Sequence, residues 1–135
     1  MLLKPTGYEG PFEQKDPWKF NKERNYAPMA YIWAPFTGDV NAYAEIVRRW
    51  CDLAGRKGYI PVAPYLMFPR MTSASGEDAE LFVCVNAVNM LLKCQELWII
   101  GGSGMDISNQ MIDELIHALR HRKAVRIVTE ADLNE

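Results

Sequence analysis

The sequence predicts an α/β fold, namely a three-layer domain of Rossmann or flavodoxin type built on a parallel sheet of about four strands. Short apolar runs suited to buried strands alternate with longer amphipathic segments. Glycine and proline residues mark the junctions between them. The clearest unit runs from Glu96 to Ala118, where an apolar run breaks at a glycine loop and resumes as a helix. Strand, loop and helix in this order form half of a parallel α/β unit.

Composition and charge narrow the class of protein. The chain has 135 residues, 49% of them hydrophobic and 24% charged, which is typical of one globular domain with a real core. A net charge of −2 disfavours general nucleic-acid binding, and no apolar run is long enough to span a membrane. The N-terminus lacks the basic-then-apolar pattern of a signal peptide. We therefore expect a cytoplasmic protein with no nucleic-acid or membrane partner, whose cysteines are reduced and buried.

The sequence predicts neither a metal nor a cofactor. None of the three cysteines lies in a CxxC motif, and there are only two histidines, so no zinc-binding set is present. His117 and His121 are four residues apart on one predicted helix, a spacing that can hold a metal. A solvent-facing pair near a helix C-terminus is the favoured interpretation.

Residues 1–28 differ in composition from the rest of the chain. They are rich in Pro, Gly, Lys and Glu and contain five scattered aromatic residues, but they show no helical or strand period. The aromatic residues argue against full disorder. We expect an irregular arm that docks on the body or on a neighbouring subunit, and an α/β domain over residues 29–135.

The first half of this domain contains two predicted strands and one helix. Residues 29–33 form a short apolar β-rich run, and the loop at 34–39 is broken by Pro and Gly. Residues 41–54 carry apolar side chains on one face and charged side chains on the other, as in an amphipathic helix. Residues 59–63 form the second strand, and Pro61 indicates an edge position.

The second half repeats the alternation after a long loop at 64–76. Residues 77–93 form a predicted helix that is almost free of charge after its first turn, so we expect it to be buried against another subunit in a homo-oligomer, a dimer or larger. The third strand is predicted at 97–100 and the third helix at about 108–122. The fourth strand is predicted at 124–128 and is followed by a short polar tail.

Right-handed crossovers and an edge position for the second strand give the strand order 2-1-3-4. This order creates a switch point between the first and third strands, where ligands bind beyond the carboxyl ends of the strands. The loops at 34–39 and 101–107 meet there, and both are small and polar. A ligand cleft is therefore predicted between them.

The glycine loop contains the first candidate binding residues. The run Gly101-Gly102-Ser103-Gly104 allows close backbone approach, and the following helix N-terminus favours an anion. It matches neither GxxxxGK[ST] nor GxGxxG, so a flexible turn is equally compatible. Ser108 either caps the helix or holds a phosphate or carboxylate. Asp106 competes for the cap or binds a sugar hydroxyl, and Phe36 is placed to stack on a base.

Glu114 is the candidate for chemistry because it lies beside the apolar stripe of the third helix. Three interpretations are open: a solvent-exposed carboxylate, a buried structural ion pair, or a catalytic carboxylate at the predicted cleft. Tyr31, near the carboxyl end of the first strand, is either a core residue or a phenol that reaches the cleft.

Four segments together carry a family resemblance. They are Tyr31–Phe36 followed by Gly38-Asp39, then Gly58–Leu66, Leu92–Trp98 and Ser108–Leu115. In this order and spacing they resemble the nucleoside 2-deoxyribosyltransferase-like family, including its small bacterial and phage members. The resemblance covers residues 29–128.

The resemblance implies an N-glycosidic-bond enzyme acting on a nucleoside or nucleotide. In active members the glutamate of the fourth motif attacks the anomeric carbon and releases the base, and a second base or water resolves the glycosyl-enzyme. Glu114 would then be the nucleophile, and Tyr31 would orient it. The implied substrate-binding residues are Pro35, Phe36, Gly38, Asp39, Asn89, Gly101, Gly102, Ser103, Asp106, Ser108 and Met111.

Two departures from the family pattern support a second hypothesis. Gln95 replaces the usual aspartate of the third motif, and Asn89 lies near the place of another acid. Without these acids, proton donation to the leaving base is weakened, and such help contributes ~10²–10⁴-fold. The alternative is a non-catalytic binding protein for a nucleotide or nucleotide-derived signal that uses the same cleft.

Overall fold

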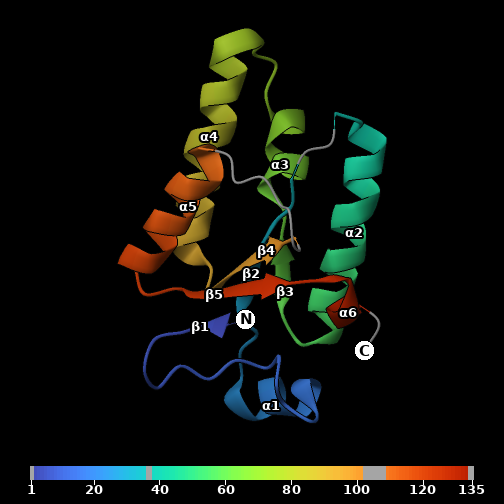
Figure 1. Cartoon of the computed structure of the whole chain (residues 1–135), viewed down its shortest axis with the longest axis vertical. Helices are drawn as coiled ribbons and strands as arrows, with labels where there is room; N and C mark the ends of the chain where they lie inside the picture. Colours follow the sequence, from blue (N-terminus) through green and yellow to red (C-terminus); the bar gives the residue numbers. More distant parts are fainter. Residues whose placement is uncertain (1, 36–37, 102–108, 134–135) are drawn as a thin grey trace.

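A five-stranded sheet with helices on both faces forms the centre of the molecule (Figure 1). The computed structural model describes residues 2–35, 38–101 and 109–133. The sheet order is β1-β5-β4-β2-β3, with β2, β3, β4 and β5 parallel and β1 antiparallel to β5. The strands are β1 (Leu2–Leu3), β2 (Met29–Trp33), β3 (Ile60–Val62), β4 (Glu96–Ile100) and β5 (Ala124–Val128).

The α/β class is confirmed, whereas the predicted sheet is wrong in detail. The described residues form five strands instead of about four, and the order differs from the predicted one by the antiparallel β1 beyond β5. With only two residues, β1 is too short to produce a recognisable alternation of polar and apolar residues.

Helices account for most of the remaining described residues. They are α1 (Pro17–Arg24), α2 (Val40–Arg56), α3 (Pro64–Met67), α4 (Gly76–Lys93), α5 (Asn109–Arg120), α6 (Glu130–Leu133) and the 3₁₀ helix η1 (Phe68–Met71). The predicted loop at 64–76 therefore contains α3 and η1, and the predicted tail contains α6. Both α3 and η1 have a proline in their first turn, where the missing N–H costs nothing.

Alternating side chains of the strands feed two separate core clusters. In β2, Ala30 and Ile32 pack with α2, whereas Tyr31 and Trp33 pack with residues of α4 and α5. Figure 1 shows α2 on one side of the sheet and α4 and α5 on the other. A strand buried on both faces has no polar face, which explains why β2 reads as a continuous apolar run.

Helix α2 forms as its pattern predicts. The Asp39 carboxylate caps its N-terminus by accepting bonds from the backbone N–H groups of Asn41 at 2.9 Å and Ala42 at 3.2 Å. Its buried side chains recur at spacings of three or four: Tyr43, Val47, Trp50, Leu53 and Ala54. This capped, amphipathic helix covers one face of the sheet.

Within a single chain, helix α4 is only partly buried. Of its 18 residues, only Ala87 and Leu91 are fully buried, while Leu81 is 63% exposed and Val85 is 50% exposed. Cys84 on the same helix is exposed as well, which corrects the prediction of three buried thiols.

Among the described residues, no helix combines the length and the apolar character needed to cross a bilayer.

The N-terminal segment is not an irregular arm throughout. It contains β1 and α1, and α1 begins at a local signal: the Asp16 carboxylate accepts a bond from the Lys19 N–H, and Pro17 occupies the first turn. Phe12 packs edge-on against Trp98 with ring centroids 5.4 Å apart. The segment therefore docks on the body of the same chain.

A buried carboxylate anchors this segment to the sheet. Glu96 is 0% exposed and accepts hydrogen bonds from the phenols of Tyr8 and Tyr59 at Oε2. At Oε1 it accepts bonds from Nε1 of Trp98 at 2.9 Å and from Nε of Arg126 at 3.2 Å. Four donors satisfy the carboxylate, as a buried charge requires.

Candidate functional site

Three side chains meet at Glu114. The Tyr31 phenol donates to its Oε1 at 2.7 Å, and the Tyr65 phenol donates to the same oxygen. These residues come from α5, β2 and α3, so the cluster draws on three separate elements. We call these three residues the Glu114 cluster.

The position of Glu114 on α5 explains its burial. Met111, Glu114 and Ala118 follow one another at spacings of three and four, and all three are buried, so they share the inner face of the helix. Glu114 itself is only 1% exposed. The carboxylate therefore points into the protein, which excludes the solvent-exposed interpretation.

The other oxygen of the carboxylate is different. Among the described residues, Oε2 of Glu114 has no hydrogen-bond partner, and no lysine or arginine forms an ion pair with this side chain. Within that part of the chain, Glu114 is thus no structural ion pair. A buried carboxylate with one unsatisfied oxygen is costly, and such costs are concentrated at functional sites.

The pKa values in the cluster follow from burial. Desolvation raises the pKa of Glu114, the two phenol hydrogen bonds lower it, and the charge of Asp113 raises it again, leaving it above its ordinary value. Desolvation and the nearby carboxylate strongly raise the pKa of Tyr31 and of Tyr65. Burial and the charge of Glu114 raise the pKa of Tyr43 to about 12. The phenols are therefore neutral donors and poor acids.

The structure brings together some of the predicted site residues. Tyr31 and Glu114 are bonded, and Met111 is buried in the same core cluster as Tyr31. Pro35 follows β2 and Gly101 follows β4, so both lie just beyond the carboxyl ends of central strands. Five predicted residues lie outside the described part of the chain: Phe36, Gly102, Ser103, Asp106 and Ser108.

Other predicted site residues have contacts elsewhere. Asp39 caps α2, and Gly38 before it has a φ of +89°, which favours glycine. Asn89 is exposed, and its Nδ2 donates to the Val85 carbonyl within α4. Gln95 accepts a bond from the Met29 N–H at 2.6 Å through its Oε1. Asn89 thus bonds within its own helix, and Gln95 bonds the first residue of β2.

Tyr65 is the residue that the sequence did not identify. The sequence predicts a loop there, whereas Tyr65 follows Pro64 and lies in the first turn of α3. The signal that was present is the Pro-Tyr pair directly after a strand, since proline at this position begins a helix. Its contact with Glu114, 49 positions away, has no local pattern.

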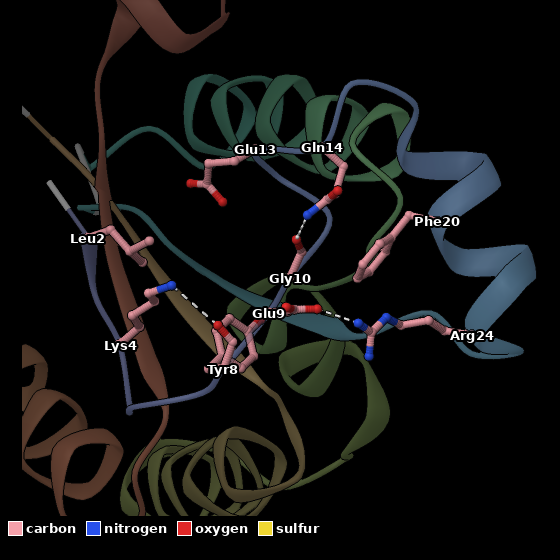
Figure 2. A pocket seen from close by; sticks show the side chains of 9 residues that line it. All are labelled: Leu2, Lys4, Tyr8, Glu9, Gly10, Glu13, Gln14, Phe20 and Arg24. Carbon is pink, nitrogen blue, oxygen red and sulfur yellow. Dashed lines mark hydrogen bonds and ion pairs between the residues drawn. The ribbon is translucent and has the colours of Figure 1, made fainter.

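The N-terminal segment lines an open hollow of about 500 Å³. Figure 2 shows its lining, in which Arg24 pairs with Glu9 and the Gln14 amide donates to the Gly10 carbonyl. Lys4 donates to the Tyr8 carbonyl at 3.3 Å. These contacts bind the segment to itself, and none of the lining residues belongs to the Glu114 cluster.

The part of the chain that the structure describes contains no group of three or more His, Cys, Asp or Glu side chains placed to hold a metal ion. His117 and His121 stack with ring centroids 6.3 Å apart, and Nδ1 of His121 lies 2.9 Å from the His117 carbonyl oxygen. This pair is thus engaged with its own helix.

Comparison with known proteins gives one family. No curated protein sequence matches the chain. A family model described as a domain of unknown function, DUF7768, matches residues 28–128, which include β2 to β5 and all three residues of the Glu114 cluster. The chain therefore belongs to the DUF7768 family.

Proposed function

We propose that this protein breaks N-glycosidic bonds in nucleosides or nucleotides, with Glu114 as the nucleophile. The observation that carries the proposal is the state of this carboxylate: it is 1% exposed, two phenols hold one oxygen, and the other has no partner among the described residues. A desolvated carboxylate held in one orientation is suited to attack an electrophilic carbon.

The reaction runs in two steps. In the first, an oxygen of Glu114 bonds to the anomeric carbon while the bond from that carbon to the base nitrogen breaks. The electron pair leaves with the base, which takes a proton from solvent. In the second, water or another base bonds to the same carbon, the ester bond breaks, and its electron pair returns to Glu114. The proton of the attacking group goes to solvent.

The surroundings of the cluster support this proposal. We take the fold to be of Rossmann or flavodoxin type, in which ligands bind beyond the carboxyl ends of the strands. Tyr65 follows the carboxyl end of β3, and Gly101 begins the glycine-rich segment after β4. The resemblance of four sequence segments to nucleoside 2-deoxyribosyltransferase-like proteins points to the same chemistry.

The test is base release from 2′-deoxynucleosides, ribonucleosides and their 5′-monophosphates, followed by chromatography. We expect wild-type protein to release base, and Glu114→Gln to abolish release. Asp113→Asn is the matched control, because it removes the neighbouring, exposed carboxylate of the same helix and should leave release within about twofold. Equal release by Glu114→Gln and wild type would refute the proposal.

A second candidate is a non-catalytic binding protein for a nucleotide or nucleotide-derived signal. The observation in its favour is the lack of an evident acid: within the described residues, both hydrogen-bond donors to Glu114 are phenols with raised pKa values. Thermal-shift measurements with the same panel distinguish the two. A shift without base release supports the binding protein, and a shift with release supports the enzyme.

We also propose a homo-oligomer formed through α4 and α5. Large apolar side chains are exposed on both helices, at Leu81, Val85, Ile112, Ile116 and Leu119. The two helices pack together, and Figure 1 shows them on the same side of the sheet. Exposed apolar patches of this kind mark interaction surfaces.

We propose a cytoplasmic location as well. Cys51, Cys84 and Cys94 are all free thiols, which supports a reducing compartment.

A further inference from the structure

Two phenols converge on one oxygen of a single carboxylate. Tyr31 approaches Oε1 of Glu114 from the sheet, and Tyr65 approaches it from α3, after the neighbouring strand β3. Tyr65 packs against both core clusters, so its ring is held from both sides. The two oxygens of Glu114 are therefore unequal: Oε1 has two donors, and Oε2 has none among the described residues.

We infer that Tyr65 is a positioning residue that, together with Tyr31, reserves Oε2 of Glu114 for the bond to the sugar and promotes the departure of the carboxylate in the second step. This inference rests on the proposed function. It assigns a role to a residue in a segment that the sequence predicts to be a loop.

The charge on Oε1 explains why the second step depends more strongly on the two phenol hydrogen bonds than the first step does. While Oε2 is bonded to the sugar, Oε1 is a neutral ester carbonyl and accepts weaker hydrogen bonds. When the bond between Oε2 and the anomeric carbon breaks, negative charge returns to the carboxylate, and both phenol bonds strengthen. In the first step the same bonds weaken as Glu114 loses its charge. Donors placed only on Oε1 thus favour breakdown of the intermediate over its formation.

Three other titratable groups lie near the Glu114 cluster, and none of them contributes a hydrogen bond that shifts the pKa of Glu114: Tyr43, Cys84 and Asp113. Tyr43 of α2 has a pKa of about 12, and Asp113 of α5 is exposed. An electrostatic interaction with Cys84 of α4 makes a small contribution to the raised pKa of Tyr65. Tyr31 and Tyr65 are the two groups whose bonds to Glu114 lower its pKa.

The first measurement is the fate of the intermediate in Tyr65→Phe. With a substrate that releases base, such as 2′-deoxyinosine from the panel, we expect a burst of base followed by turnover at least ~10-fold slower than wild type, from the loss of a hydrogen bond to a charged group. Intact-mass spectrometry should then show a deoxyribosyl adduct on most of the protein. Tyr59→Phe is the matched control, because it deletes a buried phenol that donates to Glu96. It should show no adduct.

The second measurement needs no substrate. In protein labelled with ¹³C at the glutamate carboxyls, with Glu114 assigned by its loss in Glu114→Gln, Tyr65→Phe should raise the pKa of Glu114, and Tyr59→Phe should not. The acid limb of the pH–rate profile should move in the same direction. An unchanged Glu114 pKa overturns the positioning role, and active Tyr65→Phe without adduct overturns the role in the second step. Failure of wild-type protein to release any base refutes the proposed function instead.

Discussion

Tyr31 and Glu114 are 83 positions apart in the sequence and are joined by a hydrogen bond of 2.7 Å in the core. The bond connects the sheet to α5, and it fixes a carboxylate in a place that water does not reach. Because the pKa of Glu114 is raised, its ionisation opposes folding, and this has consequences for stability as well as for chemistry.

Glu114→Gln should remove a pH-dependent loss of stability. A carboxyl with a raised pKa binds its proton more tightly in the folded state, so wild-type protein loses stability as pH rises through the window above the ordinary value of 4.5. The variant lacks this loss, so its stability relative to wild type should increase as the pH rises above 4.5. Urea unfolding at a series of pH values measures the difference. A difference that stays constant with pH would contradict the raised pKa.

Glu96→Gln should weaken docking of the N-terminal segment. The change leaves Arg126, which is 5% exposed, without its buried partner and alters bonds to Tyr8 and Tyr59. Breaking a buried ion pair costs about 3–5 kcal/mol, so the urea midpoint should fall sharply. The matched control is Glu45→Gln, whose surface pair with Arg48 should contribute less than about 1 kcal/mol. Equal effects of the two changes would show that Glu96 is no anchor.

Gly10→Ala tests the same anchor from the other side. A Cβ at Gly10 would lie 2.6 Å from Oε2 of Glu96 and 2.7 Å from the Tyr8 hydroxyl oxygen. These atoms are held by hydrogen bonds, so the variant should lose about 1–3 kcal/mol through overpacking. Gly55→Ala in α2 is the control, because a Cβ there meets nothing within 4 Å and alanine favours a helix. Thermal unfolding should rank Gly55→Ala at or above wild type.

The proposed oligomer predicts a change of mass on charge insertion. Leu81→Lys and Ile116→Lys place a charge on the exposed apolar faces of α4 and α5 and should shift the protein to a smaller species in light scattering after size exclusion. Val40→Lys on α2 alters a similarly exposed apolar side chain on the other side of the sheet, and it should leave the mass unchanged. A monomeric wild-type protein would end this proposal.

Much of the sheet and of α2 could be predicted because the signals are local. The apolar run of β4 and the cap and periodicity of α2 each lie within a few residues. The sequence leaves the direction of the Glu114 side chain open, because a carboxylate beside an apolar stripe can turn to solvent or into the protein. The inward direction depends on hydrogen bonds from phenols of two other elements, β2 and α3.

The parts that could not be predicted depend on contacts between distant residues. Helix α1 has no amphipathic period, and its only local sequence signals are the N-cap Asp16 and the first-turn Pro17. Glu96 begins an apolar strand, and its donors at positions 8, 59 and 126 share no spacing that sequence reading recognises. For α4 the sequence predicts an apolar surface but not which side chains its own chain covers, and Leu81 is 63% exposed.

The anchoring of the N-terminal segment has a practical meaning for work on the family. A shortened protein limited to residues 28–128 would discard Tyr8 and Phe12, uncover the indole of Trp98 and leave the Glu96 carboxylate with fewer donors. In such a fragment the Glu96 carboxylate and the Trp98 ring would become exposed to solvent, and the fragment should tend to aggregate during purification. Laboratories that express this domain should keep the residues ahead of the matched region.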